Sequence, residues 1–179
     1  MNPVVTVFGS SRPRWGEPEY TLAYDLGRAL ALAGYVLCNG GYGGTMEASA
    51  RGAQDASGRT IGITCAAFGG RLPNRWIHDV EEQPTFVARL VRLIERGDAY
   101  VILKGGTGTL LELAAVWEFM TKKMLAERPV LALGDFWRPV QSAVSEELDE
   151  QSRAFVTTVP TVHACIRTLN EKLRRSHEP

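Results

Sequence analysis

Short apolar runs alternate with longer amphipathic stretches along this 179-residue chain. The apolar runs are rich in β-branched and aliphatic side chains and predict buried strands at residues 4–8, 35–38, 60–64, 99–103, 130–133 and 155–159. Stretches with apolar side chains three or four positions apart predict helices at residues 19–33, 45–56, 86–96, 110–124, 137–148 and 161–174. Residues 66–83 are polar, contain glycine and proline, and predict a long loop with a functional role.

The regular alternation of strand and helix predicts an α/β fold. Such a chain forms a Rossmann-like, mostly parallel sheet with helices on both faces. We find no internal repeat, low-complexity tract or linker, so we expect residues 1–179 to form a single domain. Ligands of such sheets bind at the carboxyl ends of the strands, and the turns at those ends are therefore the first place to look for function.

Composition and charge exclude several classes of partner. Lys plus Arg and Asp plus Glu number 20 each, which gives no electrostatic reason to expect nucleic acid or an anionic membrane. The three cysteines, Cys38, Cys65 and Cys165, have no spacing typical of disulfides or zinc sites. The first residues do not resemble a signal peptide, and no stretch approaches the ~20 apolar residues of a membrane span. We therefore expect a cytoplasmic protein.

Three of the predicted strands end in turns rich in glycine and small polar residues. The residues that we expect to bind a ligand there are Gly9, Ser10 and Ser11, then Gly41, Gly43 and Gly44, and finally Gly105, Gly106, Thr107, Gly108 and Thr109. Glycine lets the backbone approach a ligand closely, and the free N–H groups at the start of the next helix attract an anion. One such turn is equally typical of simple chain reversal, but three at one sheet edge indicate a site for a nucleotide or a related phosphorylated ligand.

The positions around these turns argue against the commonest nucleotide-dependent enzymes. Lys104 precedes the third glycine turn, whereas the lysine of a Walker motif follows its glycines. The first strand carries no GxGxxG pattern, and no acidic residue ends the second strand to bind a ribose. These absences disfavour a kinase, an NTPase or a dehydrogenase.

The third turn and the helix after it carry a resemblance to a known family. The run Gly105-Gly106-Thr107-Gly108-Thr109-Leu110-Leu111-Glu112 resembles the PGGxGTxxE motif of the Lonely Guy family of cytokinin-activating phosphoribohydrolases. The likeness extends over residues 4–140 and includes the first two glycine turns. It implies a Rossmann-like fold, a homodimer, and cleavage of a nucleoside 5′-monophosphate such as AMP or N6-substituted AMP into free base and ribose 5-phosphate.

The same resemblance implies a catalytic pair without any cofactor. The family's motif glutamate corresponds to Glu112, and the arginine of its Met-x-x-Arg-Lys motif corresponds to Arg89. The chain departs from the pattern at three neighbouring positions, where Phe86, Leu90 and Lys104 replace methionine, lysine and proline. A near relative of the fold carries molybdenum cofactor without hydrolysis, so a non-catalytic carrier of a nucleotide or of molybdenum cofactor is the alternative.

Cleavage of an N-glycosidic bond passes through an oxocarbenium-like sugar. A nearby carboxylate stabilises the positive charge of this sugar or activates the water that attacks it. Glu112 stands one turn into the helix after the phosphate turn, but the helix dipole alone also favours an acidic residue there. Arg89 lies on an amphipathic helix, where an arginine is more often simply solvated. No cluster of histidine and acidic residues suggests a metal.

Other side chains are candidates for lesser roles. Trp76 and His78 lie in the long loop and are candidates for lining the base pocket, and Arg12 and Arg14 could add charge beside the phosphate. For Trp117, Phe119 and Met120 we expect either a place in the core or a dimer face.

Overall fold

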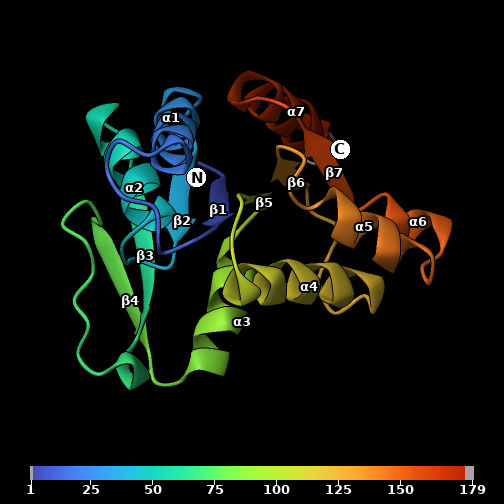
Figure 1. The fold of residues 1–179 in the computed structure, drawn as a ribbon, viewed down its shortest axis with the longest axis horizontal. Coiled ribbons are helices and arrows are strands. Elements are labelled where there is room, and N and C mark those ends of the chain that lie inside the picture. The colour runs from blue at the N-terminus through green and yellow to red at the C-terminus, as the bar shows by residue number, and fades with distance from the viewer. Residues whose placement is uncertain (1, 176–179) are drawn as a thin grey trace.

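The computed structural model describes residues 2–175 and contains one sheet of seven parallel strands in the order β4-β3-β2-β1-β5-β6-β7 (Figure 1). The strands are β1 (Val4–Phe8), β2 (Val36–Asn39), β3 (Thr60–Cys65), β4 (Asp79–Gln83), β5 (Ala99–Ile102), β6 (Val130–Leu133) and β7 (Val156–Val159). The helices are α1 (Pro18–Leu32), α2 (Thr45–Asp55), α3 (Phe86–Arg96), α4 (Thr107–Thr121), α5 (Arg138–Ser145), α6 (Glu150–Arg153) and α7 (Val162–Arg175), with a short 3₁₀ helix, η1 (Ala66–Phe68). The predicted Rossmann-like α/β fold is confirmed.

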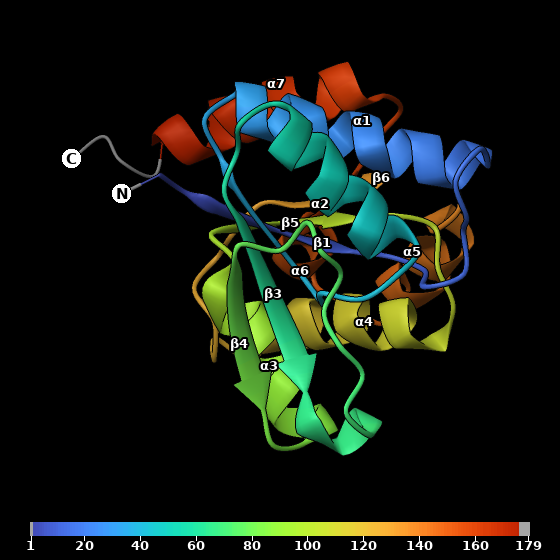
Figure 2. The same cartoon turned by 90° about the vertical axis from the view of Figure 1, so that its left-hand side faces the viewer.

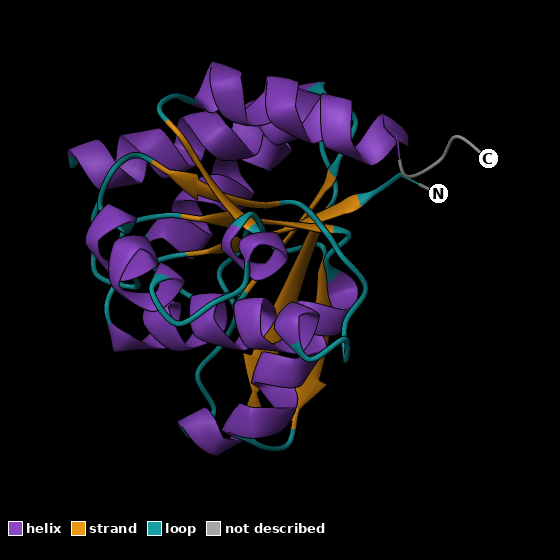
Figure 3. Cartoon of the chain, turned by 90° about the vertical axis from the view of Figure 1, so that its right-hand side faces the viewer, coloured by secondary structure: helices purple, strands orange, loops and turns teal. Residues whose placement is uncertain are grey.

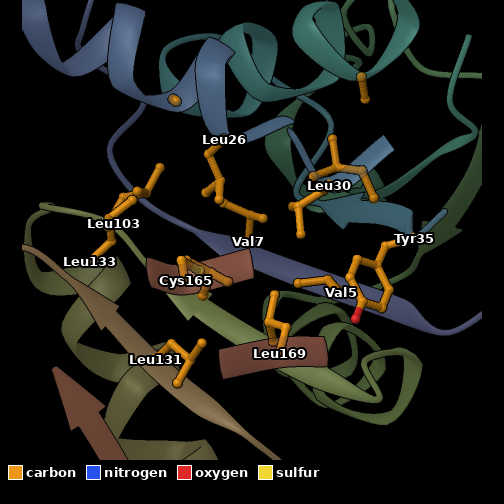
Figure 4. Close-up of a cluster of buried hydrophobic side chains, with 14 of the residues drawn as sticks. Val5, Val7, Leu26, Leu30, Tyr35, Leu103, Leu131, Leu133, Cys165 and Leu169 are labelled. Atoms are coloured by element: carbon orange, nitrogen blue, oxygen red, sulfur yellow. The ribbon is translucent and has the colours of Figure 1, made fainter. Parts of the chain in front are cut away.

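Helices cover both faces of the sheet (Figures 2 and 3). On one face, α1, α2 and α7 pack over β1, whose Val5 and Val7 contact Leu26, Leu30 and Leu169 in a buried cluster (Figure 4). Alternate strand residues point to opposite faces, so the residues of β1 that alternate with these valines point to the other face of the sheet. Burial on both faces explains why the strand sequences are apolar without alternation.

The second core lies between the sheet and α3, α4 and α5. Phe8 and Tyr100 stack there with ring centroids 6.0 Å apart, and both are fully buried. Trp117 donates its indole N–H to the carbonyl of Ser152 at 2.7 Å. Met120 is also buried, and Phe119 packs partly buried against the same cluster, so all three side chains contribute to this core.

Helices α1 and α2 lie close together because each carries a glycine where it faces the other helix. A Cβ placed on Gly27 would meet the carbonyl oxygen of Ser49 at 1.9 Å, and one on Gly52 would meet that of Tyr24 at 2.0 Å. Within residues 2–175 there is no helix long and apolar enough to cross a membrane.

The predicted loop over residues 66–83 is only partly a loop, and the prediction was wrong at its end. Residues Asp79–Gln83 form the edge strand β4, which pairs with β3 from Ile61 opposite Asp79 to Cys65 opposite Gln83. Its acidic sequence carries no strand signal, and its register comes from hydrogen bonding to β3. The predicted helix over residues 110–124 also begins earlier, because α4 includes Thr107, and the helix predicted over residues 137–148 ends at Ser145.

Candidate functional site

A cavity of about 820 Å³ opens at the carboxyl ends of the central strands. Strands β1 and β5 are neighbours, yet the chain runs outward from them in opposite directions, so the sheet has its topological switch point there. Ligands of open α/β sheets bind at this point. Among the predicted residues, the cavity is lined by Gly9, Ser10, Ser11, Arg89, Gly105, Gly106, Thr107, Gly108, Thr109 and Glu112.

The third glycine turn forms one end of this cavity and becomes the start of α4. Gly106 is the N-cap residue, and no side chain caps the helix, so the first N–H groups face the cavity without a side-chain acceptor. A Cβ on Gly105 would meet the Thr109 hydroxyl oxygen at 2.1 Å, which explains why glycine stands there. Thr107 and Gly108 are exposed, whereas Thr109 is buried. This end of the cavity is suited to an anion.

The first glycine turn is held against the start of α2. The carbonyl oxygen of Ser10 accepts hydrogen bonds from the Thr45 N–H at 2.9 Å and from the Thr45 hydroxyl at 3.1 Å. A Cβ on Gly9 would meet that same hydroxyl oxygen at 2.4 Å. The Ser10 hydroxyl in turn accepts the Arg12 N–H at 3.1 Å. Ser10 and Ser11 are thus presented to the cavity by a fixed turn.

The second glycine turn supports the site from behind. Gly41, Gly43 and Gly44 are absent from the lining of this cavity. Gly44 has a positive φ of 70°, and a Cβ there would lie 2.3 Å from the Ser10 carbonyl oxygen. Tyr42 is the residue of this turn that lines the cavity. In the sequence it stands out only as an aromatic residue among the glycines.

Arg89 is buried at the base of the cavity and held by two carbonyl groups. Its Nε donates to Ile63 O at 2.7 Å and its Nη2 to Gly40 O at 3.2 Å. Within the described residues Nη1 has no hydrogen-bond partner, and the side chain lines the cavity. A Cβ on Gly40 would meet Nη2 at 1.8 Å, so glycine at that position makes room for the guanidinium.

Glu112 faces Arg89 across the cavity from α4. Its carboxyl is partly buried, and burial raises its pKa to about 7 against the opposing effect of the positive charge of Arg89. Burial lowers the pKa of Arg89, and the charge of Glu112 counteracts this. No ion pair of 4.0 Å or less joins the two among residues 2–175, and both side chains line the cavity.

Aromatic side chains form another part of the cavity wall. The Phe68 ring lies 5.8 Å from the Tyr42 ring and 6.0 Å from the Phe86 ring, and all three side chains line the cavity. Arg71 lines it as well, with its guanidinium 5.7 Å from the Tyr42 ring centroid. Sequence reasoning placed a functional role in this loop but missed Phe68 and Arg71.

Trp76 and His78 lie elsewhere, so their expected place in a base pocket is wrong for this cavity. Trp76 is partly buried against the core under α1 and α2. His78 is tied to β3, where its Nδ1 lies 2.9 Å from the Thr60 hydroxyl. The loop brings Phe68 to the cavity and turns Trp76 away from it.

Lys104, which replaces the proline of the resembled motif, lies at the rim of the cavity. Its Nζ forms an exposed ion pair with Glu19 Oε1 at 2.7 Å, and this pair lowers the pKa of Glu19. The pair joins the third glycine turn to the first turn of α1. Within the part of the chain that the structure describes, no three His, Cys, Asp or Glu side chains gather in a group that could hold a metal.

Fold and cavity together define a Rossmann-like protein with a cavity at the switch point of its sheet. The chain belongs to the SLOG cluster4 family, whose model matches residues 2–165. A cytokinin riboside 5′-monophosphate phosphoribohydrolase of Rhodococcoides fascians is 31% identical over 153 residues, which cover 78% of this chain and 73% of that protein. The resemblance to the Lonely Guy family is thereby confirmed.

An uncharacterized protein of Archaeoglobus fulgidus is 36% identical over 105 residues, and the match covers 55% of this chain and 64% of that protein. The chain thus spans just under two thirds of the length of this relative.

Two solved structures share the fold over almost the full length. The molybdenum cofactor carrier protein of Chlamydomonas reinhardtii has a TM-score of 0.79 at 21% identity, covering 97% of this chain and 99% of that one. The molybdenum cofactor binding protein of Rippkaea orientalis also has a TM-score of 0.79, at 26% identity, with 97% and 98% covered.

Proposed function

We propose that this protein hydrolyses the N-glycosidic bond of a nucleoside 5′-monophosphate, releasing the free base and ribose 5-phosphate. The observation that carries the proposal is the convergence of Arg89, Glu112 and the open N-terminus of α4 on one cavity. The naming of relatives as phosphoribohydrolases supports the same activity.

In this proposal each of the three parts of such a substrate contacts a different part of the cavity lining. The phosphate lies at the start of α4 and the Ser10–Ser11 turn, where free N–H groups and hydroxyls are available. Glu112 is five residues beyond Thr107, which at ~1.5 Å per residue places it about 7.5 Å along the helix, within reach of a ribose. The base then stacks against Phe68 and Phe86.

Glu112 supplies the general base. It takes a proton from water while the water oxygen attacks the anomeric carbon, and the bond from that carbon to the base nitrogen breaks. The electron pair of the broken bond leaves with the base, which takes a proton from solvent, and Glu112 returns the proton that it accepted to solvent. A carboxyl with a pKa of about 7 is matched to this role near neutral pH, and its negative charge stabilises the positive sugar.

Arg89 positions the reacting groups. Two of its nitrogens are held by carbonyls, and the remaining Nη1 donates toward the ribose or the departing base. Its charge also favours the ionised form of Glu112. A homodimer is part of this proposal, supported by the exposed Val87 of α3 and Leu111 of the neighbouring α4.

A second candidate function is that of a non-catalytic carrier of a nucleotide or of molybdenum cofactor. The likeness to molybdenum cofactor carrier and binding proteins over nearly the whole chain favours it. The replacement of three motif neighbours by Phe86, Leu90 and Lys104 points the same way. A carrier binds its ligand in this cavity and returns it unchanged.

Incubation with AMP and with N6-isopentenyl-AMP, followed by chromatography of the bases, tests the proposal. We expect base release by the wild type and a loss of about 100-fold or more in the Glu112→Gln variant, with AMP binding retained. Glu118→Gln is the matched control, because Glu118 is an exposed acid on the same helix. Binding of AMP without base release from any purine or pyrimidine monophosphate would overturn hydrolysis and favour the carrier.

A further inference from the structure

A second hollow of about 490 Å³ adjoins the first and is lined in part by residues of α1 and α2. It is bounded by the turn after β1, by Tyr20 of α1, and by Gly44 and Glu47 at the start of α2. The two hollows have Ser11, Arg12 and Pro13 in common. The two hollows therefore adjoin at this turn, and we call the second one the extension. Neither the proposed reaction nor the resemblance assigns it a role.

The wall of this extension carries a tryptophan held in place although it is exposed. Trp15 is 68% exposed, yet the guanidinium of Arg51 lies 4.1 Å from its ring centroid. The Tyr20 ring meets it edge-on at 5.7 Å, and Tyr20 in turn donates its hydroxyl to Glu47 at 3.1 Å. A large aromatic ring positioned in this way, with most of its surface in water, is typical of a residue that stacks on a ligand.

Two arginines give the same wall an excess of positive charge. Among residues 2–175, the side chains of Arg12 and Arg14 form neither ion pairs nor hydrogen bonds, and both line the extension. Their backbone N–H groups are held, by the Ser10 hydroxyl at 3.1 Å and by the Glu17 carboxylate at 2.9 Å. The turn is thus ordered while the two guanidinium groups stay available for an anion.

The position of the junction between the two hollows indicates which part of a ligand would enter the extension. The residues that both hollows share, 11–13, continue directly from the Ser10–Ser11 turn, whereas Phe68 and Phe86 line the first hollow alone. A ligand whose first phosphate lies at this junction would continue into the extension through a second phosphate. The placement of this first phosphate rests on the proposed function.

We propose that the extension is a second subsite, which binds the far half of a diphosphate-bridged dinucleotide. Arg12 and Arg14 contact the second phosphate, and the second base stacks on Trp15. The first cavity then holds the near nucleoside, with its base against Phe68. The protein on this view recognises a larger ligand than a nucleoside monophosphate.

Calorimetric titration with AMP, ADP and P1,P2-di(adenosine-5′) diphosphate tests the subsite, in the wild type and in Glu112→Gln to prevent turnover. We expect the diadenosine compound to bind about tenfold or more tightly than AMP, because both ends are engaged. Trp15→Ala should weaken its binding about fivefold or more while changing that of AMP less than about twofold. Trp15→Phe should restore most of the loss. Arg14→Ala should weaken ADP and the diadenosine compound, whereas Arg75→Ala, an exposed arginine that lines neither hollow, should not.

Equal affinities for AMP and the diadenosine compound, or an unchanged affinity in Trp15→Ala, would overturn the subsite. This outcome leaves base release from AMP unaffected, so it is separate from failure of the proposed function. Conversely, selective and Trp15-dependent binding of the diadenosine compound by a protein that releases no base would support the subsite and refute hydrolysis.

Discussion

At the scale of single residues, the surroundings of Glu112 decide what chemistry is available. A carboxyl on the surface of a helix is ionised at neutral pH and serves only for solubility. The partial burial of Glu112 raises its pKa to about 7, so near neutral pH it exists in both forms and can exchange protons with a ligand or water. Arg89 limits this shift through its charge, and within the described residues it forms no ion pair with Glu112.

The pKa of Glu112 makes stability depend on pH in a defined direction. Between its ordinary pKa of 4.5 and about 7, the folded protein holds a proton that the unfolded chain has released. The free energy of unfolding therefore falls as pH rises through this window. Glu112→Gln removes this pH dependence. Between about pH 5 and about pH 8, the free energy of unfolding of the variant should therefore rise by about 2 kcal/mol relative to that of the wild type, allowing for partial solvent screening.

Urea unfolding of both proteins at these two pH values measures that difference. Glu118→Gln, on the exposed side of α4, should show no comparable gain between them. A stability difference between Glu112→Gln and the wild type that stays constant with pH would mean that the carboxyl titrates in its ordinary range.

At the scale of elements, close packing between α1 and α2 positions the turn that precedes each helix. Gly27 and Gly52 let the two backbones approach, and this fixes Gly44 and Thr45 against the Ser10 turn. The start of α4 is placed independently, by β5 and by the second core. The two segments that we propose to bind the phosphate are thus brought together by different layers of the same fold.

Gly27→Ala tests this packing. The added Cβ would meet the Ser49 carbonyl at 1.9 Å, and the backbone there cannot yield without moving α2. We expect the free energy of unfolding to fall by about 1–3 kcal/mol, despite the better helix propensity of alanine. Gly43→Ala, where the structure leaves open space around the added Cβ, should change it by less than about 0.5 kcal/mol. Wild-type stability in Gly27→Ala would contradict the close approach.

At the scale of the whole molecule, the switch point of the sheet explains why one cavity collects residues from distant parts of the chain. The ends of β1 and β5 lie side by side, as the pairing of Phe8 with Ile102 shows. Segments that follow β1, β2, β3 and β5 therefore surround one space, and a ligand there contacts all of them.

Such a ligand should stabilise the fold as a unit. At about 100 times its dissociation constant, AMP should add about 2.7 kcal/mol, which raises the Tm of a domain of this size by about 5–10 °C. Differential scanning fluorimetry with AMP, with inosine monophosphate and with adenosine as the control lacking phosphate measures this shift. Equal shifts with adenosine and AMP would mean that the phosphate contributes nothing to binding.

The sequence by itself determined the class of fold and much of the candidate site. The apolar runs are buried on both faces, so their pattern was sufficient to predict six of the strands and a parallel sheet. Glycine turns are also recognisable in the sequence, because the backbone conformation that requires glycine is local. Ten of the residues predicted for binding or catalysis line the cavity.

Only the tertiary structure decided which segments of the loops and turns face the ligand space. Strand β4 is acidic and exists because β3 offers it an edge, and the direction of Phe68 and Trp76 depends on how the loop between them packs. Gly41 and Gly43 of the second glycine turn line neither hollow, and Trp15 lines a hollow that the turn after β1 forms together with α1 and the start of α2. Such placements depend on contacts between residues far apart in the chain, and a pattern of neighbouring residues carries no record of them.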